Sequence, residues 1–303
     1  MSKITAVISA FNEEGNIERC LKSLEFADEI IVVDHESSDN TTAIAKKYTN
    51  KVFSQKNNQA EIDLQKNFGF TKASNNWILC IDADEEVSPE LAKEIKTVLK
   101  GENGINGYWI PRKNIIFGKV IEHTGWFPDP QLRLFRKGKG KYIKAHVHEH
   151  LQLEGESAYL NTFLIHHNYD TVSQFIRRTV DIYAPNEAKD YLDKGYQFDY
   201  LDAIRFPVKE FISRFFAREG YKDGLHGLML SILMAFYHFM IFAYIWEKKD
   251  FIEVNSSTFL QETETEVKKA HRDIMSWFYN EKLKAIKNPV NKNLQRILKR
   301  IPR

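Results

Sequence analysis

The sequence predicts an α/β fold with a mostly parallel sheet and flanking helices, followed by a helical C-terminal region. Three observations support this prediction. Short apolar runs alternate with helix-like stretches through the first 100 residues, as in a parallel sheet covered on both faces. A helical pattern then runs from Asp170 to the end of the chain. Within it, Leu225–Trp246 is a run of 22 residues without a formal charge.

The first part of the chain contains four expected strands and four expected helices. The strands are Ile4–Ala10, Glu29–Val33, Lys51–Gln55 and Trp77–Ile81. The helices lie around Ile17–Leu24, from Thr41, over Ala60–Ala73 and from Ser88-Pro89, where serine suits the N-cap and proline the first turn. Strands and turns follow between Gly107 and His150, including Gly107–Arg112 and Gln131–Arg136.

These changes of pattern divide the chain into three expected regions. Residues 1–170 form an α/β domain, residues 171–249 a helical region, and residues 250–303 a charged tail. The tail has five acidic residues between Asp250 and Val267, then eleven Lys/Arg against two acidic residues from Lys268 to Arg303, or 11 − 2 = +9. A basic end indicates an anionic partner, either lipid or nucleic acid, or simply a solvated helix with a frayed tail.

Composition is ordinary for a globular protein, with 43% hydrophobic and 28% charged residues. Cys20 and Cys80 lie in apolar patterns, which favours reduced core cysteines in a cytosolic protein. The apolar run Ile4–Phe11 is interrupted at once by polar residues, unlike a signal peptide. We therefore expect a cytoplasmic protein.

Polar residues follow three of the expected strands, at Asn12-Glu13-Glu14, Asp34–Asp39 and Asp82–Glu86. Ligands of parallel sheets bind beyond the carboxyl ends of the strands, so these residues should converge on one crevice. In an extended segment, residues two apart point the same way, so Asp82 and Asp84 can face one ligand. Two carboxylates suit Mg²⁺ or Mn²⁺, which can neutralise charge on a leaving diphosphate.

Three motifs carry a resemblance to a known family: Ile8–Glu14, Ile31–Asp34 with Ser37–Thr41, and Trp77–Glu85. Together they resemble family 2 glycosyltransferases of the GT-A fold, most closely short enzymes of the lipopolysaccharide-core type that resemble bacterial β-1,4-glucosyltransferases. The resemblance covers about the first 170 residues well and the stretch to about residue 247 loosely.

The resemblance implies roles for residues at the strand ends. Phe11, Asn12, Glu13 and Asp34 would contact the nucleotide base, and a carboxylate can accept from the imide N–H of uracil. Asp82 would face the ribose or the metal, and Asp84 the metal itself.

Basic residues would face the donor phosphates. Lys66 lies where the family often has such a residue, although it can equally be a surface lysine. Arg133 and Arg136 suit phosphate clamping, or form the exposed face of a strand.

Glu149, in His146–His150, matches the position of the family's catalytic base, which deprotonates the acceptor hydroxyl. His166 matches a histidine near the metal or diphosphate, or is structural. His146, His148 and His150 alternate along an apparent strand and could be zinc ligands, but no further Cys or His cluster supports that.

The apolar run Leu225–Trp246 leaves three possibilities: a spanning helix, a helix lying in the membrane interface, or a buried core element. A single span would carry the basic tail out of the cytosol, against the positive-inside tendency. We favour peripheral attachment to the anionic inner face of the cell membrane through aromatic and basic surfaces.

The expected function is a metal-dependent, inverting transfer of a hexose from a nucleotide sugar, a UDP-sugar, to a glycan or glycolipid acceptor of the cell envelope, including lipopolysaccharide. The alternatives are a haloacid-dehalogenase-like phosphatase, for which Glu86 stands where Thr or Val is wanted, and a non-catalytic sugar-nucleotide-binding protein. A pyrophosphorylase would need a Gly-rich first loop, which Asn12-Glu13-Glu14 lacks. No nucleic-acid motif accompanies the basic tail, so we expect no nucleic-acid partner.

Overall fold

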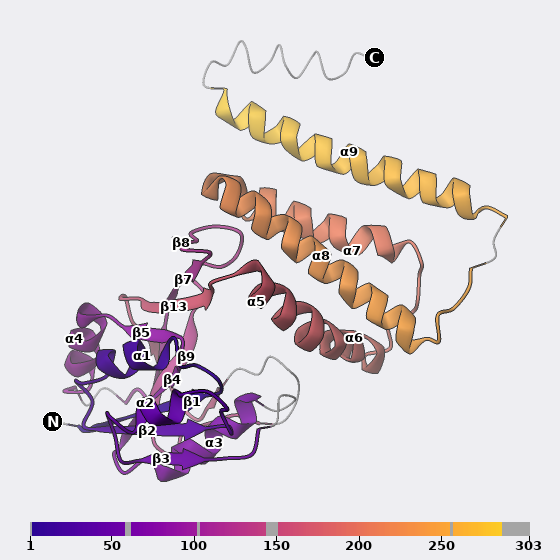
Figure 1. Ribbon diagram of the computed structural model, residues 1–303. Coiled ribbons are helices and arrows are strands. Elements are labelled where there is room, and N and C mark those ends of the chain that lie inside the picture. The colour runs from indigo at the N-terminus through magenta and orange to yellow at the C-terminus, as the bar shows by residue number, and fades with distance from the viewer. Residues whose placement is uncertain (1, 58–61, 102–103, 144–150, 255–256, 287–303) are drawn as a thin grey trace. The chain divides into compact units, whose positions relative to one another are not determined.

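The computed structural model describes residues 2–57, 62–101, 104–143, 151–254 and 257–286 (Figure 1). The chain divides into two compact units. The first unit comprises residues 1–122 and 126–177, and the second comprises residues 123–125 and 178–303.

A seven-stranded sheet forms the centre of the first unit, in the order β12-β6-β9-β4-β1-β2-β3. Its parallel core consists of β1 (Ile4–Ala10), β2 (Glu29–Asp34), β3 (Val52–Ser54) and β4 (Trp77–Asp82). The other strands are β6 (Gly107–Ile110), β9 (Gln131–Arg136) and β12 (Ser157–Tyr159), of which β9 runs antiparallel to β4 and β6. The predicted α/β fold with a mostly parallel sheet is confirmed.

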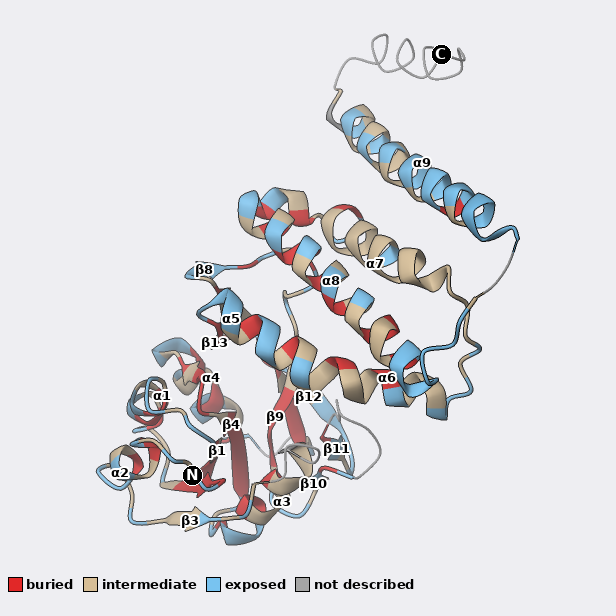
Figure 2. Cartoon of the chain, turned by 45° about the vertical axis from the view of Figure 1, so that its right-hand side comes forward, coloured by how far each residue is buried: buried red, intermediate tan, exposed pale blue. Residues whose placement is uncertain are grey.

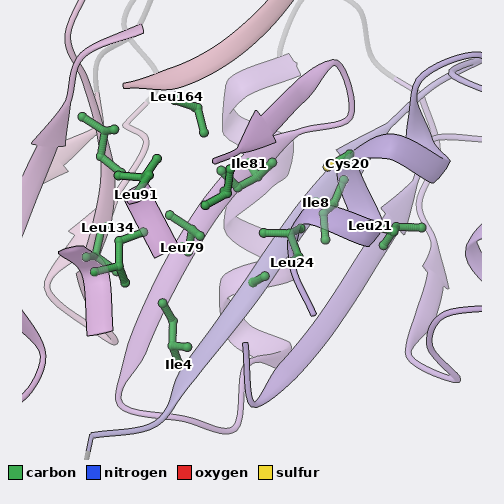
Figure 3. Packing of buried hydrophobic residues seen from close by; sticks show 14 of the residues in the cluster. Ile4, Ile8, Cys20, Leu21, Leu24, Leu79, Ile81, Leu91, Leu134 and Leu164 are labelled. Carbon is green, nitrogen blue, oxygen red and sulfur yellow. The ribbon is translucent and has the colours of Figure 1, made fainter. Parts of the chain in front are cut away.

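The sheet is buried on both faces, as the continuous apolar strands predicted. Alternate residues of β1 enter different core clusters: Ile4 and Ile8 contribute to one and Val7 to the other. Figure 3 shows the first cluster, in which Ile8 and Ile81 pack with Leu21. The flanking helices are α1 (Ile17–Ser23), α2 (Thr41–Ala45), α3 (Ile62–Lys72) and α4 (Pro89–Val98).

Helix α3 lies close against the sheet at Gly69. A Cβ atom there would lie 2.5 Å from Val7 Cγ1 and 3.0 Å from Val33 Cγ2, closer than a side chain allows. Helix α4 begins at the predicted cap, where Ser88 Oγ accepts from the amide of Leu91 at 3.1 Å.

A second sheet of four strands has the order β5-β13-β7-β8. Its strands are β5 (Glu85–Val87), β13 (Leu164–Tyr169), β7 (Arg112–Ile116) and β8 (Lys119–Val120), and a short pair joins β10 (Gly140–Lys141) to β11 (Gln152–Leu153). The predicted single strand Gly107–Arg112 is wrong: Pro111 lies between β6 and β7, and these strands belong to different sheets.

Helices dominate the end of the chain, as predicted. They are α5 (Val172–Ile176), the π-helical η2 (Arg177–Tyr183), α6 (Ala184–Asp193), α7 (Asp202–Ile212), the π-helical η3 (Ser213–Ala217), the 3-10 turn η4 (Gly220–Asp223), α8 (Leu225–Lys248) and α9 (Phe259–Ala285). Helix α8 is long and apolar enough to cross a membrane, and 39% of its most apolar window is buried in the protein. Figure 2 shows buried and exposed residues on this one helix.

Candidate active site

The loops that follow β1 and β2 are tied together by hydrogen bonds. The amide of Asn12 donates to Ser37 Oγ at 2.9 Å, and Asn12 Oδ1 accepts from the amide of Ser38 at 2.8 Å. Asn12 has a φ of 54°, a left-handed conformation that asparagine tolerates better than most residues. Since β1 and β2 are parallel neighbours, the predicted base-contacting residues Phe11–Glu13 and Asp34 lie at adjacent strand ends.

Asp34 and His35 are buried at the end of β2, with 3% and 4% of their surfaces exposed. Asp34 Oδ2 accepts from the amide of Ser37 at 3.1 Å, whereas Oδ1 has no hydrogen-bond partner among the described residues. Neither ring nitrogen of His35 has a partner there either. Burial lowers the pKa of His35, which favours the neutral imidazole. A buried acceptor without a partner is costly unless a ligand satisfies it.

Asp82, at the end of β4, holds two buried cations. Lys66 Nζ lies 2.7 Å from Asp82 Oδ1, and Arg133 Nη2 donates to Asp82 Oδ2. Lys66 also pairs with Asp63 at 3.0 Å. Because Lys66 is only 5% exposed, it is not a surface lysine. Burial alone would raise the pKa of Asp82, but Arg133 and Lys66 more than offset this, and the pKa lies well below its usual value.

Glu85 connects this cluster to a second group of charges. Its carboxylate accepts from the amide of Asp82 at 2.9 Å, from Arg133 Nη2 at 2.7 Å and from Arg112 Nη1 at 3.1 Å. Arg112 in turn donates to Asp129 Oδ2 from Nη2 at 2.6 Å and from Nε at 3.1 Å. Glu85 has no exposed side-chain surface, so its charge is balanced by these two guanidinium groups.

Asn114 joins Asp129 to His166. Asn114 Nδ2 donates to the carbonyl oxygen of Trp126 at 2.5 Å and to Asp129 Oδ2 at 3.2 Å, which leaves Oδ1 to accept from His166 Nδ1 at 2.6 Å. That hydrogen bond places a proton on Nδ1 of His166. His166 Nε2 lies 3.5 Å from Asp84 Oδ1.

The expected extended geometry of Asp82-Ala83-Asp84 is wrong. Ala83 and Asp84 form a turn between β4 and β5, so the strand alternation on which the expectation rested does not apply. Asp82 faces Lys66 and Arg133, whereas Asp84 faces His166. Among the described residues, no group of three or more His, Cys, Asp or Glu side chains is arranged to hold a metal ion.

Arg136 lies apart from the predicted site. It pairs in register with Trp77, the first residue of β4, while Asp82 is the last. Five residues of strand correspond to roughly 16 Å. Its guanidinium lies over the Trp77 ring, 4.8 Å from the centroid, and Nε donates to the carbonyl of Ile105. Because β9 runs antiparallel to β4, its last residue, Arg136, lies at the amino-terminal end of β4, whereas the predicted site lies at the carboxyl end. We therefore leave Arg136 out of the site.

The predicted site and the site in the structure differ in two groups of residues. Glu149, with its neighbours His146, His148 and His150, lies outside the described residues. In contrast, the structure adds Arg112 and Asn114, and it gives individual contacts to Glu85 and places His35, which had been expected at the crevice only as members of strand-end runs. Asn114 could have been noticed in the sequence, because it is a polar residue directly before the apolar pair Ile115-Ile116. Nothing in the sequence indicated that Arg112, 27 positions from Glu85, would pair with it.

A parallel sheet whose strand ends gather buried acids and bases is typical of enzymes that bind nucleotides. Residues 5–152 match the model of Glycosyl transferase family 2, so the chain carries a domain of this family and is a glycosyltransferase. An uncharacterized glycosyltransferase of Rickettsia typhi is 29% identical over 259 residues, covering 82% of this chain and 88% of that protein.

Two further proteins extend the comparison. The lipopolysaccharide core biosynthesis glycosyltransferase LpsC of Rhizobium meliloti is 26% identical, over 81% of this chain and 92% of its own length. The crystal structure of residues 1–349 of TarS from S. aureus in complex with UDP-GlcNAc aligns with a TM-score of 0.45 at 13% identity, over 82% of this chain and 92% of that one. The family match overturns the haloacid-dehalogenase alternative.

Proposed function

We propose that the protein transfers a hexose from a UDP-sugar to a glycan or glycolipid acceptor of the cell envelope, with a divalent metal and with inversion at the anomeric carbon. It would act in the cytoplasm at the inner face of the membrane. The named role of LpsC in lipopolysaccharide core biosynthesis supports the acceptor class. The acceptor hydroxyl would attack the anomeric carbon as the bond to the diphosphate breaks, and Glu149 would take the hydroxyl proton.

The charge of the strand-end cluster carries the proposal. Four carboxylates, Asp63, Asp82, Glu85 and Asp129, pair with three cations, Lys66, Arg112 and Arg133, and Asp84 lies nearby, 3.5 Å from His166. These carboxylates and the three Lys/Arg side chains together have a formal charge of 3 − 5 = −2. A site of this charge repels a diphosphate unless a cation is added. A divalent ion offsets the charge of the cluster.

Asp84 and His166 fit such an ion. Asp84 Oδ1 and His166 Nε2 lie 3.5 Å apart, close enough for both to bind one cation. Asn114 fixes the ring of His166 by a hydrogen bond to Nδ1. Metal-binding histidines are commonly oriented by such a bond to the ring nitrogen that does not bind the metal. When bound, Mg²⁺ or Mn²⁺ would neutralise negative charge on the diphosphate. Asp82 remains a candidate ligand or ribose contact.

The remaining residues position the donor. Lys66 and Arg133 hold their cationic groups beside Asp82, where they can bind phosphate oxygens. Asp34 Oδ1, buried and without a partner among the described residues, can accept from the imide N–H of uracil. This acceptor supports a base with an imide N–H, which uracil has, because the base then satisfies a group that the described residues leave unpaired.

Thermal unfolding with UDP-, GDP- and dTDP-sugars, each with and without Mn²⁺, tests the proposal. A ligand at 100 times its Kd raises the free energy of unfolding by about 2.7 kcal/mol, so a specific donor shifts the midpoint measurably. UDP-sugars with Mn²⁺ should give the largest shift. No shift with any nucleotide sugar would overturn the donor assignment.

Asp84 variants test the metal assignment in the same assay. Asp84 is only 7% exposed, so Asp84→Asn should accompany Asp84→Ala as the more conservative change. Both should lose the Mn²⁺-dependent part of the shift. Asp193→Ala, at an exposed position at the end of α6, is the matched control. A full Mn²⁺-dependent shift in both Asp84 variants would remove Asp84 from the metal site.

A further inference from the structure

A row of apolar side chains lies exposed along α8. Its first five members are separated alternately by four and three positions and the sixth follows seven positions later, which places all of them on one side of the helix. They have between 40% and 71% of their surfaces exposed, and we call them the α8 stripe: Leu225, Met229, Ile232, Phe236, Phe239 and Trp246. From Leu225 to Trp246 the row spans roughly 32 Å of helix.

The opposite side of α8 is buried within the second unit. Leu230, Tyr237, Ile241 and Ile245 are at most 6% exposed. The helix is therefore apolar on both sides, buried against protein on one and exposed on the other. A core helix of the same composition would be mostly buried, but only 39% of the most apolar window is buried.

A pocket of about 500 Å³ opens beside the carboxyl end of this stripe. Phe239 and Trp246 belong to both the stripe and the pocket wall, and Phe198, Ala203 and Phe242 also line it. Ala243, between these aromatic residues on α8, leaves room in the wall.

The walls of this pocket offer little to a polar ligand. The hydroxyl of Tyr200 already donates to Glu262, and Glu253 is the charged residue among the described lining. A pocket of this size and chemistry suits a ligand without hydrogen-bonding groups.

Backbone strain holds a further aromatic residue next to the stripe. Asp250 and Phe251 have φ values of 55° and 52°, a region that a bulky residue such as phenylalanine rarely adopts. The resulting turn brings the Phe251 ring to 5.0 Å from that of Trp246, and Trp246 Nε1 donates to the carbonyl of Ile252 at 3.0 Å. Phe251 is 54% exposed, so the strained turn presents an aromatic ring to the surroundings.

We propose that the α8 stripe lies on a membrane and that the adjoining pocket takes one hydrocarbon chain of a bilayer phospholipid. Lipid is favoured over a second copy of the chain because α8 carries no formal charge between Leu225 and Trp246, whereas helices that pair with helices in water use flanking charges to fix the partner. A Trp and an exposed Phe at one end of the stripe suit the bilayer interface. The charges of residues 247–250, Glu247, Lys248, Lys249 and Asp250, cancel, so the headgroup need not be anionic.

Neutral phosphatidylcholine vesicles with brominated acyl chains, in high salt, test this proposal without any nucleotide. Bromine quenches the fluorescence of tryptophans in contact with the chains, and Trp246 should be quenched. Trp246→Phe should remove most of the quenched signal from the five tryptophans. The absence of quenching in the wild-type protein would overturn the proposal, whatever the donor assay shows.

Substitutions can distinguish the contribution of the α8 stripe to lipid binding from that of the pocket. Met229→Ser with Ile232→Ser should weaken vesicle binding roughly tenfold or more, because two exposed apolar side chains are lost from the stripe. Met275→Ser, at a 50% exposed position on α9, is the matched control and should change nothing. Equal effects of the stripe and control variants would contradict membrane contact through α8.

Ala203→Phe and Ala243→Phe fill the pocket from two sides and should reduce the bound single-chain amphiphile dodecylphosphocholine, measured below its micelle concentration. Ala217→Phe, which adds the same ring at an exposed position outside the lining, should not. Circular dichroism confirms that each variant is folded. Unchanged binding in both folded pocket variants, or a concentration-dependent dimer without vesicle binding, would overturn the proposal.

Discussion

In the first unit, charged side chains are buried and paired with one another, whereas in the second unit apolar side chains lie exposed along α8. Arg133 is 4% exposed between Asp82 and Glu85, while Leu225 is 71% exposed with no described neighbour to cover it. Both arrangements are unfavourable in water unless something compensates. In the first unit Arg133 is compensated internally by these two carboxylates. In the second unit, membrane contact as proposed above would supply the compensation.

The buried ion pairs of the first unit and the α8 stripe of the second should therefore respond to different perturbations. Buried ion pairs tolerate salt but fail when one partner is removed. An exposed apolar surface tolerates pH and salt but fails when its area is reduced.

Removal of the Glu85 charge should have the largest effect on stability. Glu85→Gln leaves the guanidinium groups of Arg112 and Arg133 facing an amide in a site without solvent, and breaking a buried pair lowers the free energy of unfolding by about 3–5 kcal/mol. Urea unfolding measures the change. Glu154→Gln removes an ion pair with Lys139 from a carboxylate that is 74% exposed, and should have no measurable effect. Similar losses in both variants would contradict the distinction between buried and exposed pairs.

The residues of this network entered the sequence analysis in two ways. Asp34 and Asp82 stood out because a parallel sheet places consecutive strand ends at one edge, where polar residues contrast with apolar strands. Lys66 and Arg133 came only from the family resemblance, and in the structure both lie beside Asp82. Arg136 was misplaced because β9 runs antiparallel, which the sequence pattern does not reveal. The individual contacts of Glu85 were missed because they depend on two arginines distant in the sequence.

The second unit was harder to predict for a different reason. The length and composition of Leu225–Trp246 fitted a spanning, an interfacial and a buried helix alike. Which side of α8 is covered depends on α6 and α7, whose packing the periodicity of α8 alone cannot give. The pocket depends on Phe198 and Phe259, which lie 61 positions apart in the sequence (259 − 198) and on either side of α8.

Acid should weaken the first unit through Glu29, at the start of β2. Burial raises its pKa, but Lys51, Thr5 and Ser74 together outweigh burial and lower the pKa from 4.5 to about 2. Because the folded pKa is the lower one, the stabilisation is present above pH 4.5 and is lost as the pH falls toward 2. The difference corresponds to about 3 kcal/mol, an order-of-magnitude value for a side chain that is 7% exposed.

Glu29→Gln should remove this dependence. The variant should be less stable at pH 7 and its free energy of unfolding should change less with pH between 4.5 and 2, as measured by urea unfolding at a series of pH values. If wild type and variant lose stability in parallel over this range, another group is responsible for the acid sensitivity.

Glu149→Gln should lower kcat roughly 100-fold or more, equivalent to about 2.7 kcal/mol, without loss of donor affinity. The amide keeps the shape of the side chain but cannot take the proton of the acceptor hydroxyl. Turnover and donor binding should be measured on the same preparation, with Glu154→Gln as the control.

Near wild-type turnover would place the base elsewhere. Asp129 is the next carboxylate to consider, but it accepts from Arg112, Asn114 and Gln131, and its pKa is lowered by Arg112 and Asn114 despite burial. A carboxylate held ionised in this way is a weak base. These contacts therefore favour a catalytic base outside the network that contains Asp129.

The smallest effect should come from the basic end of the chain. Residues 287–303 contain six Lys/Arg and no acidic residue. Their deletion leaves α9 (Phe259–Ala285), which packs its Phe278 against Phe216 with ring centroids 4.8 Å apart, in place. Each basic residue close to an anionic bilayer contributes up to about 1 kcal/mol, and distance and salt reduce this, so we expect a roughly tenfold loss of binding, or about 1.4 kcal/mol.

Headgroup and salt together separate this contribution from that of the α8 stripe. The deletion should weaken binding to phosphatidylglycerol vesicles at low salt, and should have no effect on phosphatidylcholine vesicles or at high salt, where charges are screened. Met229→Ser with Ile232→Ser should weaken binding under all of these conditions, because the apolar contribution does not depend on headgroup charge. A deletion that abolished binding to neutral vesicles would mean that the C-terminal residues, rather than the α8 stripe, make the apolar contact with the membrane.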